Sequence, residues 1–311
     1  MELLIPNRIL NDDTYKLYIA YATESKELSV VKCDGSIRYC DSNPQGKILR
    51  CKLCQYRVKK IAELTGQSID FSSKEIPKVQ LSKSLRFKFK NSALSILASQ
   101  EAVSLEERLS KNAIKNLDNL VNSSQVLFLF LKNILLQVPN VSRLVVFNGR
   151  YPLSLATYLA AKEIDLDFRA LELWGRKVPH GAQNRLIHDP KHIFESCYKS
   201  YQGLNSKDID RISAAYYESR WKQGGGASGE KDFTSNQEIM LDNIFKSSDK
   251  VVKLAGFPSS NFEYNFLPEG YCAVHQENEL KSLINQLAKY EFNTELVLRL
   301  DTNLKKSKSI E

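Results

Sequence analysis

Four of the six cysteines of this chain lie within 22 residues, directly after an apolar run that predicts a strand at 27–32. They are Cys33, Cys40, Cys51 and Cys54, and the last two have the Cys-x-x-Cys spacing with which two thiolates bind a tetrahedral metal ion. Six residues separate the first pair, a wider spacing than in most zinc ribbons. The cluster leaves two interpretations open: a structural zinc site that staples a segment poor in apolar residues, or four partly buried thiols without metal.

The overall composition predicts a globular protein with a substantial core. The chain has 311 residues, of which 42% are hydrophobic and 10% aromatic, enough for two domains or one large one. The best apolar run, 126–138, is too short to span a bilayer, and the N-terminus lacks a signal-peptide pattern. We expect a cytoplasmic protein without an organic cofactor, whose reduced cysteines serve a metal site or packing rather than disulfides.

The net charge of +8 is concentrated in one segment. Residues 47–90 contain twelve lysines and arginines against three acids, so the rest of the chain is close to neutral. A local basic field suits an anionic partner: a phosphate-bearing substrate, an anionic membrane surface or nucleic acid. For any single lysine, however, a solvated surface position is the simpler interpretation.

The pattern of elements predicts an α/β fold with a parallel sheet. Strands are expected at 2–5, 27–32, 143–147 and 167–173, and helices at 13–23, 52–64 and 152–161. Helical spacing dominates 92–136, whereas 67–90 reads as irregular. The strand, turn, helix, strand order of 143–173 implies a right-handed parallel crossover.

Ligands of such sheets bind at the carboxyl ends of the strands. Two sets of candidate residues fall at those ends: Asn148, Gly149 and Arg150, and then Glu172, Trp174 and Gly175. The permissive backbone of Gly149 suits a tight turn beneath a ligand. We therefore expect a Rossmann-like domain over 1–223, with the cysteine segment 33–54 inserted after its second strand.

The C-terminal part predicts a second, smaller unit. A helix is expected from Ser206 to about 222, and the glycine-rich 224–236 reads as a linker. A strand at 250–255, a helix at 277–289 and a strand at 294–300 form a second βαβ unit within 237–311. One such unit buries too little surface for a stable domain, so we expect an incomplete second Rossmann-like domain or one that packs onto the first.

Several short motifs occur in the order found in a known family. They are the cysteine segment, Phe147-Asn-Gly-Arg150, Leu171-Glu-Leu-Trp-Gly175, Ile187-His-Asp189, Tyr216-Tyr-Glu-Ser-Arg220, Phe233-Thr-Ser-Asn-Gln237, Gly256-Phe-Pro-Ser-Ser-Asn-Phe-Glu-Tyr264 and Leu296-Val-Leu-Arg-Leu-Asp-Thr-Asn-Leu304. On these motifs the chain resembles the bacterial capsule and lipopolysaccharide biosynthesis proteins with a GT-B-like glycosyltransferase architecture.

The resemblance implies transfer of a sugar from a nucleotide-sugar donor to a glycan acceptor. It makes Glu172 the candidate base, with His188 and Asp189 as an oriented pair. The candidate substrate-binding residues are Asn148, Gly149, Arg150, Trp174, Gly175, Arg220, Ser259, Ser260 and Arg299. For each a plainer role stays open: a loop hydrogen bond for Glu172, a helix start before Pro190 for the pair, and internal ion pairs for the arginines.

The chain departs from the family pattern in two places. The family usually has Arg-x-His-Pro-Asn where this chain has Arg299-Leu-Asp-Thr-Asn303, and the missing His-Pro puts donor binding in doubt. The second domain is also short, so the chain resembles a truncated member, a fragment or half of a split protein that needs a partner chain. The function expected is a glycosyltransferase or its acceptor-binding half.

Two other functions compete with transfer. The first is a non-catalytic scaffold or partner subunit of such a transferase. The second is a nucleic-acid binder that uses the cysteine cluster and residues 47–90, which the few aromatics of that segment and the βαβ units disfavour. The same basic segment could instead hold the protein at the inner face of the cytoplasmic membrane.

Overall fold

The computed structural model describes most of the first 190 residues and selected residues beyond them. The described ranges are 1–73, 76, 81–101, 109–138, 140–174, 178–187 and 189, then 195, 198–199, 202–205, 207–208, 210–212 and 215, and finally 251–256, 281–282, 284–285, 289 and 293–298. The predicted linker 224–236 and most of the predicted second unit lie outside them.

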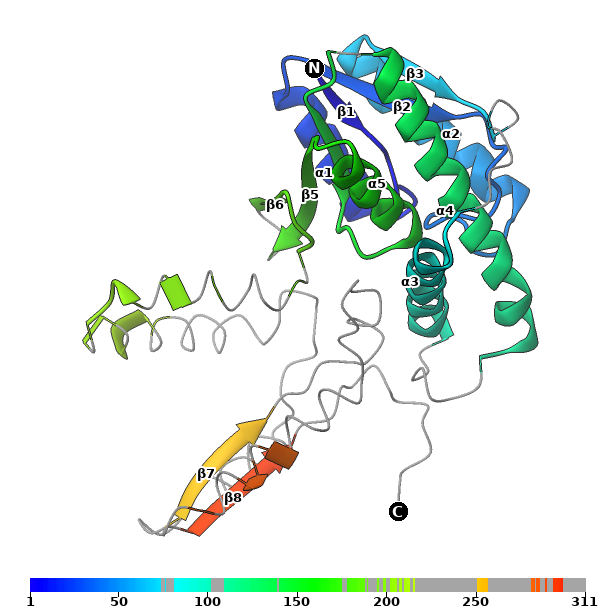
Figure 1. The fold of residues 1–311 in the computed structure, drawn as a ribbon. Coiled ribbons are helices and arrows are strands. Elements are labelled where there is room, and N and C mark those ends of the chain that lie inside the picture. Colours follow the sequence, from blue (N-terminus) through cyan, green and yellow to red (C-terminus); the bar gives the residue numbers. More distant parts are fainter. Residues whose placement is uncertain are drawn as a thin grey trace.

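The chain has α/β architecture (Figure 1). The N-terminal elements are β1 (Glu2–Leu4), α1 (Asp12–Glu24), β2 (Leu28–Cys33), α2 (Ile48–Thr65), β3 (Ser68–Phe71), α3 (Lys83–Glu101), α4 (Lys111–Gln137), β4 (Arg143–Phe147), α5 (Pro152–Glu163), β5 (Asp167–Trp174) and β6 (Val178–Gln183). The C-terminal strands are β7 (Val251–Gly256) and β8 (Asn293–Leu298).

The main sheet has six strands in the order β3-β2-β1-β4-β5-β6, a Rossmann-like arrangement. The first five strands of this order run parallel, and β6 pairs antiparallel with β5 at one edge. The central strands are buried on both faces, because Leu3, Leu4 and the middle of β4 have no exposed surface. This sheet confirms the predicted α/β fold class, but it does not distinguish GT-B from other Rossmann-like folds.

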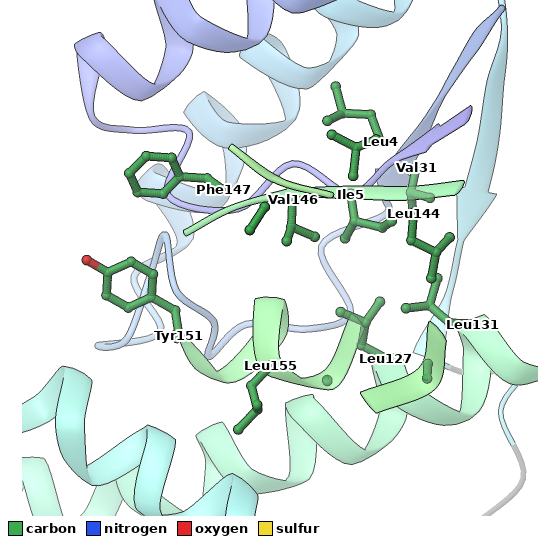
Figure 2. Packing of buried hydrophobic residues seen from close by; sticks show 14 of the residues in the cluster. Leu4, Ile5, Val31, Leu127, Leu131, Leu144, Val146, Phe147, Tyr151 and Leu155 are labelled. Carbon is green, nitrogen blue, oxygen red and sulfur yellow. The ribbon is translucent and has the colours of Figure 1, made fainter. Parts of the chain in front are cut away.

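Helices cover both faces of the sheet. Figure 2 shows α4 and α5 on one side, where Leu127 and Leu131 face Leu144, and α1 and α2 on the other. The aromatic rings of Phe71 and Phe130 are 4.5 Å apart and join α4 to the end of β3. The core of the molecule is therefore a three-layer sandwich.

Helix α4 begins well before the apolar run 126–138, which forms its C-terminal part. By length and mean hydropathy it is the one candidate membrane span among the described residues. Nine of its residues are nevertheless buried, and the helix packs against α3 and α5. That burial is typical of the core helix of a globular domain.

The structure corrects three predictions. Residues 67–90 are not all irregular, because they include β3 and the start of α3; the four-residue β3 alternates exposed and partly buried positions, too short a pattern to detect. Helix α2 starts at Ile48, so Cys51 and Cys54 are helical. Strand β6 was not predicted. Strands β7 and β8 do pair in parallel, as the βαβ pattern predicted.

Candidate functional site

The sheet order reverses direction between β1 and β4, which is where doubly wound sheets bind ligands. Two short segments leave the carboxyl ends of these strands, 5–8 and 148–151. Both contain a backbone in the left-handed region, with φ of 53° at Arg8 and 69° at Asn148. Such conformations are uncommon for residues other than glycine, and they collect at functional sites.

Asn7 joins the two segments. Its side-chain amide accepts a hydrogen bond from Phe147 N (2.9 Å) and donates one to Phe147 O (3.1 Å), so it extends the β1–β4 pairing beyond the strands. The Tyr18 hydroxyl of α1 donates to Asn7 Oδ1 over 2.7 Å. Tyr18 is fully buried, and burial raises the pKa of its hydroxyl. These bonds satisfy polar groups that would be costly to bury unpaired.

Asp41 connects the cysteine segment to this edge. Its carboxylate accepts hydrogen bonds from Asn7 Nδ2 (3.3 Å) and from the backbone of Leu153 (3.1 Å), in the first turn of α5. Helix α5 has no cap from its own N-cap residue, Tyr151, so Asp41 supplies the cap from a distant segment. Burial raises the pKa of Asp41 to about 6, against the hydrogen bonds and the nearby charge of Arg8.

The predicted residues Asn148, Gly149 and Glu172 do come together. Asn148 Nδ2 donates a hydrogen bond to Glu172 Oε2, and Asn148 N donates to Leu171 O over 2.7 Å. Gly149 has φ of 91°, and a Cβ there would lie 2.9 Å from Leu186 Cδ2. The turn therefore requires glycine for both its backbone and its space.

Two guanidinium groups flank the same aromatic ring. Arg8 Cζ lies 4.7 Å and Arg150 Cζ 5.1 Å from the centre of the Tyr151 ring. That ring in turn stacks on Phe147 at the end of β4, as Figure 2 shows. Arg150 therefore lies at the carboxyl-end edge where the sequence placed it. Arg8 and Tyr151 lie there too, although the sequence did not indicate them.

Both helices that start at this edge already have carboxylates at their N-termini. Asn11 caps α1, and Asp12 and Asp13 lie in its first turn; Asp41 caps α5. A helix N-terminus attracts phosphate because it carries partial positive charge and free N–H groups. At these two helices carboxylates of the protein already lie where a phosphate would bind, which disfavours binding of a nucleotide diphosphate there.

The four cysteines gather around the start of α2. Cys54 lies within electrostatic range of Cys33, Cys40 and Cys51, and all four are free thiols. Burial raises the pKa of the Cys33 and Cys40 thiols, and raises that of Cys54 to about 12. Among the residues that the structure describes, no three Cys, His, Asp or Glu side chains converge closely enough to hold a metal ion.

Two of the four sulfurs nevertheless accept a hydrogen bond. Gly35 N donates to Cys33 Sγ over 3.3 Å, and Asn43 Nδ2 donates to Cys51 Sγ over 3.1 Å. Such donors stabilise thiolates, including those that bind metals. The zinc prediction therefore stays open.

The remaining predicted residues are placed only in part or not at all. Trp174 ends β5, opposite Val178 of β6. Asp189 is half-buried, and its backbone N–H donates to Leu186 O in a turn. Gly175, His188, Arg220, Ser259, Ser260 and Arg299 lie outside the described residues.

A separate open hollow of about 290 Å³ lies on the helical layer, between α3, α4 and α5. Lys88, Lys162 and Glu163 line it, and none of the predicted site residues does. We assign the candidate site to the sheet edge, because the strained turns and the linked polar side chains are there.

Comparisons of the chain with protein-family models, with curated proteins and with solved structures found no match. The resemblance to the polysaccharide biosynthesis proteins therefore rests on the sequence motifs alone.

Proposed function

We propose that this chain is the acceptor-binding half of a GT-B-like glycosyltransferase of bacterial surface-polysaccharide synthesis. The observation that carries the proposal is the hydrogen bond between Asn148 and Glu172 at the point where the sheet order reverses. That bond orients the Glu172 carboxylate, and the turn that contains Asn148 continues into Arg150 and Tyr151, where the Arg8 and Arg150 guanidinium groups lie against the Tyr151 ring. A sugar hydroxyl both donates and accepts hydrogen bonds, so it suits an edge with both kinds of group.

The acidic helix N-termini favour the acceptor over the donor. A nucleotide sugar brings a diphosphate, and the N–H groups that could bind it at the starts of α1 and α5 already face the Asn11 side chain and the Asp41 carboxylate. A glycan chain carries no diphosphate, so it does not need a free helix N-terminus. In the proposed function the second Rossmann-like unit or a partner chain binds the nucleotide.

Glu172 has the role of general base. Its carboxylate takes the proton of the acceptor hydroxyl while that oxygen attacks the anomeric carbon of the donor sugar. The bond to the nucleoside diphosphate breaks, and its electron pair leaves with the phosphate oxygen. Asn148 acts as a positioning residue, because its amide donates to the carboxylate that receives the proton.

Binding experiments with the purified chain test the acceptor assignment. We expect glycan fragments to raise the melting temperature, and UDP, GDP and CMP to leave it unchanged. Arg150→Ala should weaken the response to glycans, whereas Arg211→Ala, on an exposed side chain, should not. A selective response to one nucleotide would instead make this chain the donor half, and no response to either class would contradict a sugar-binding role.

Transfer assays with the complete system test the base. Glu172→Gln keeps the size of the side chain and should lower the rate by about 10²- to 10⁴-fold. Glu163→Gln is the control, since that carboxylate pairs with Lys132 on the helical layer. A normal rate in Glu172→Gln together with unchanged glycan binding would favour the non-catalytic partner subunit, which would keep the same binding edge.

A further inference from the structure

Helix α2 exposes apolar side chains on the face that points away from the sheet. Its inner face is buried through Val58 and Ile61. Its other face carries five large apolar side chains that are 47% to 79% exposed: Ile48, Leu49, Leu53, Tyr56 and Leu64. They are five of the twelve such exposed side chains among the described residues, so they form a cluster rather than the scattered exposure normal for a protein surface.

Four of these residues, Leu49, Leu53, Tyr56 and Leu64, form a stripe along one side of the helix, with Lys60 between Tyr56 and Leu64. Leu49, Leu53 and Tyr56 follow at intervals of four and three residues, which places them on one side of a helix. Leu64 continues the stripe two turns further along. A partner that lies along the helix would therefore contact all four side chains together.

Cations border the stripe. The exposed residues Lys47, Arg50, Lys52, Lys59 and Lys60 carry positive charge, and no acid occurs in α2 before Glu63. Lys60 forms an ion pair with Glu63 over 2.8 Å, which neutralises one of the five. Arg57 does not contribute, since it pairs with Asp12 over 2.6 Å and donates to Ile9 O against the body of the domain.

We propose that this face of α2 docks on the surface of an anionic lipid bilayer. The leucines and Ile48 would enter the boundary between headgroups and acyl chains, and the lysines would contact the anionic headgroups, as in interfacial amphipathic helices. Tyr56 suits the same depth, because its ring is apolar and its hydroxyl polar. The positive charge of the lysines and of Arg50 beside the stripe favours an anionic surface over a neutral one.

The chemistry of the stripe favours lipid over nucleic acid. A base-stacking surface uses several aromatic rings, whereas Tyr56 is the only aromatic residue of α2, and the Lys60 ammonium lies 5.9 Å from its ring centre. The most exposed member, Leu49, is aliphatic and offers nothing to a base. This inference does not depend on the proposed transfer activity.

Flotation of the full chain with lipid vesicles tests the proposal. We expect binding to phosphatidylcholine vesicles that contain phosphatidylglycerol, little binding to phosphatidylcholine alone, and a decrease in binding as salt is raised. Leu49→Ser combined with Leu53→Ser should weaken binding by about tenfold or more, because two apolar side chains are then lost from the boundary with the acyl chains. Lys52→Glu combined with Lys59→Glu should weaken it by a similar factor.

Matched controls come from α4. Leu136 is as exposed as Leu49, at 79%, and Lys115 is an exposed cation, so Leu136→Ser and Lys115→Glu should leave vesicle binding unchanged. All six substitutions are on exposed side chains, and the melting temperature of each variant verifies that it folds. Equal binding to neutral vesicles, or no binding to anionic ones, would overturn the proposal. So would salt-dependent binding to single-stranded DNA in the absence of vesicle binding.

Discussion

The edge at the carboxyl ends of β1 and β4 meets the cysteine segment at Asp41, but the two regions are held in different ways. At the edge, Asn7, Asp41 and Asn148 bond to backbone and side chains that are far away in the sequence, such as Phe147, Leu153 and Glu172. In the cysteine segment, the donors to the sulfurs come from residues close in sequence, such as Gly35 and Asn43.

The difference separates two kinds of site. A site built from distant elements is as rigid as the fold that brings them together, and it cannot form without that fold. A site built from a local segment can form in part by itself, but a metal or another ligand has to complete it. Asp41 follows Cys40 directly, so a change in the local site should reach the edge.

The largest effect expected in this comparison is that of metal at the cysteine segment. The zinc prediction gives one zinc ion for each chain by elemental analysis, lost in Cys54→Ser. Since a structural zinc site contributes many kcal/mol to folding, a chelator should then lower the melting temperature strongly. Cys197→Ser, far from the cluster in sequence, is the control. Metal-free protein that melts normally in the presence of chelator would establish four plain thiols instead.

Removal of the Asn7 side chain should break the edge. Asn7→Ala leaves the N–H and C=O of Phe147 without their partner and removes one hydrogen bond of the Tyr18 hydroxyl, which keeps its bonds to the Asn7 backbone. We expect a loss of roughly 3 to 5 kcal/mol in the free energy of unfolding. Denaturant unfolding measures it. The control is Asn184→Gly, which removes an exposed amide that also bonds to a strand and keeps its left-handed backbone. Equal losses in the two variants would argue against a special role of Asn7.

The buried carboxyl of Asp41 should make stability depend on pH. Burial raises its pKa from 3.8 to about 6 in the folded state, so between these values the folded chain holds a proton that the unfolded chain has lost. The free energy of unfolding should therefore fall as pH rises from 4 to 7, by about 3 kcal/mol from this group. Asp41→Asn should remove this part of the slope, measured as the difference between the two proteins; parallel curves would refute it.

The smallest effect expected concerns the turn at Gly149. Gly149→Ala adds a Cβ at 2.9 Å from Leu186 Cδ2 in a backbone with φ of 91°, which we expect to cost about 2 kcal/mol. Gly66→Ala is the matched control, because Gly66 has φ of 68° but no atom within 4 Å of the added Cβ. Its cost should be about 1 kcal/mol. Equal melting temperatures for the two variants would show that the Leu186 side chain can move away from the added Cβ without a loss of stability.

Much of the fold was predictable because its signals are local. The apolar run Arg143–Phe147, the turn at Gly149 and the helix opened by Pro152 each depend on residues that are adjacent in the chain. Strand β3 escaped prediction because it has only four residues, and an alternation of polar and apolar residues over so short a run is not a distinct signal.

The sequence by itself determined the parallel sheet, the carboxyl-end positions of Asn148, Gly149, Arg150 and Glu172, and the clustering of the four cysteines. Only the tertiary structure decided that Asn7, Arg8, Asp41 and Tyr151 belong to the same edge. The physical reason is that these residues are brought together by hydrogen bonds and ring contacts between residues up to 143 positions apart, as for Arg8 and Tyr151. No periodicity or spacing within a single segment predicts these contacts, because they form only when the sheet places β1 beside β4.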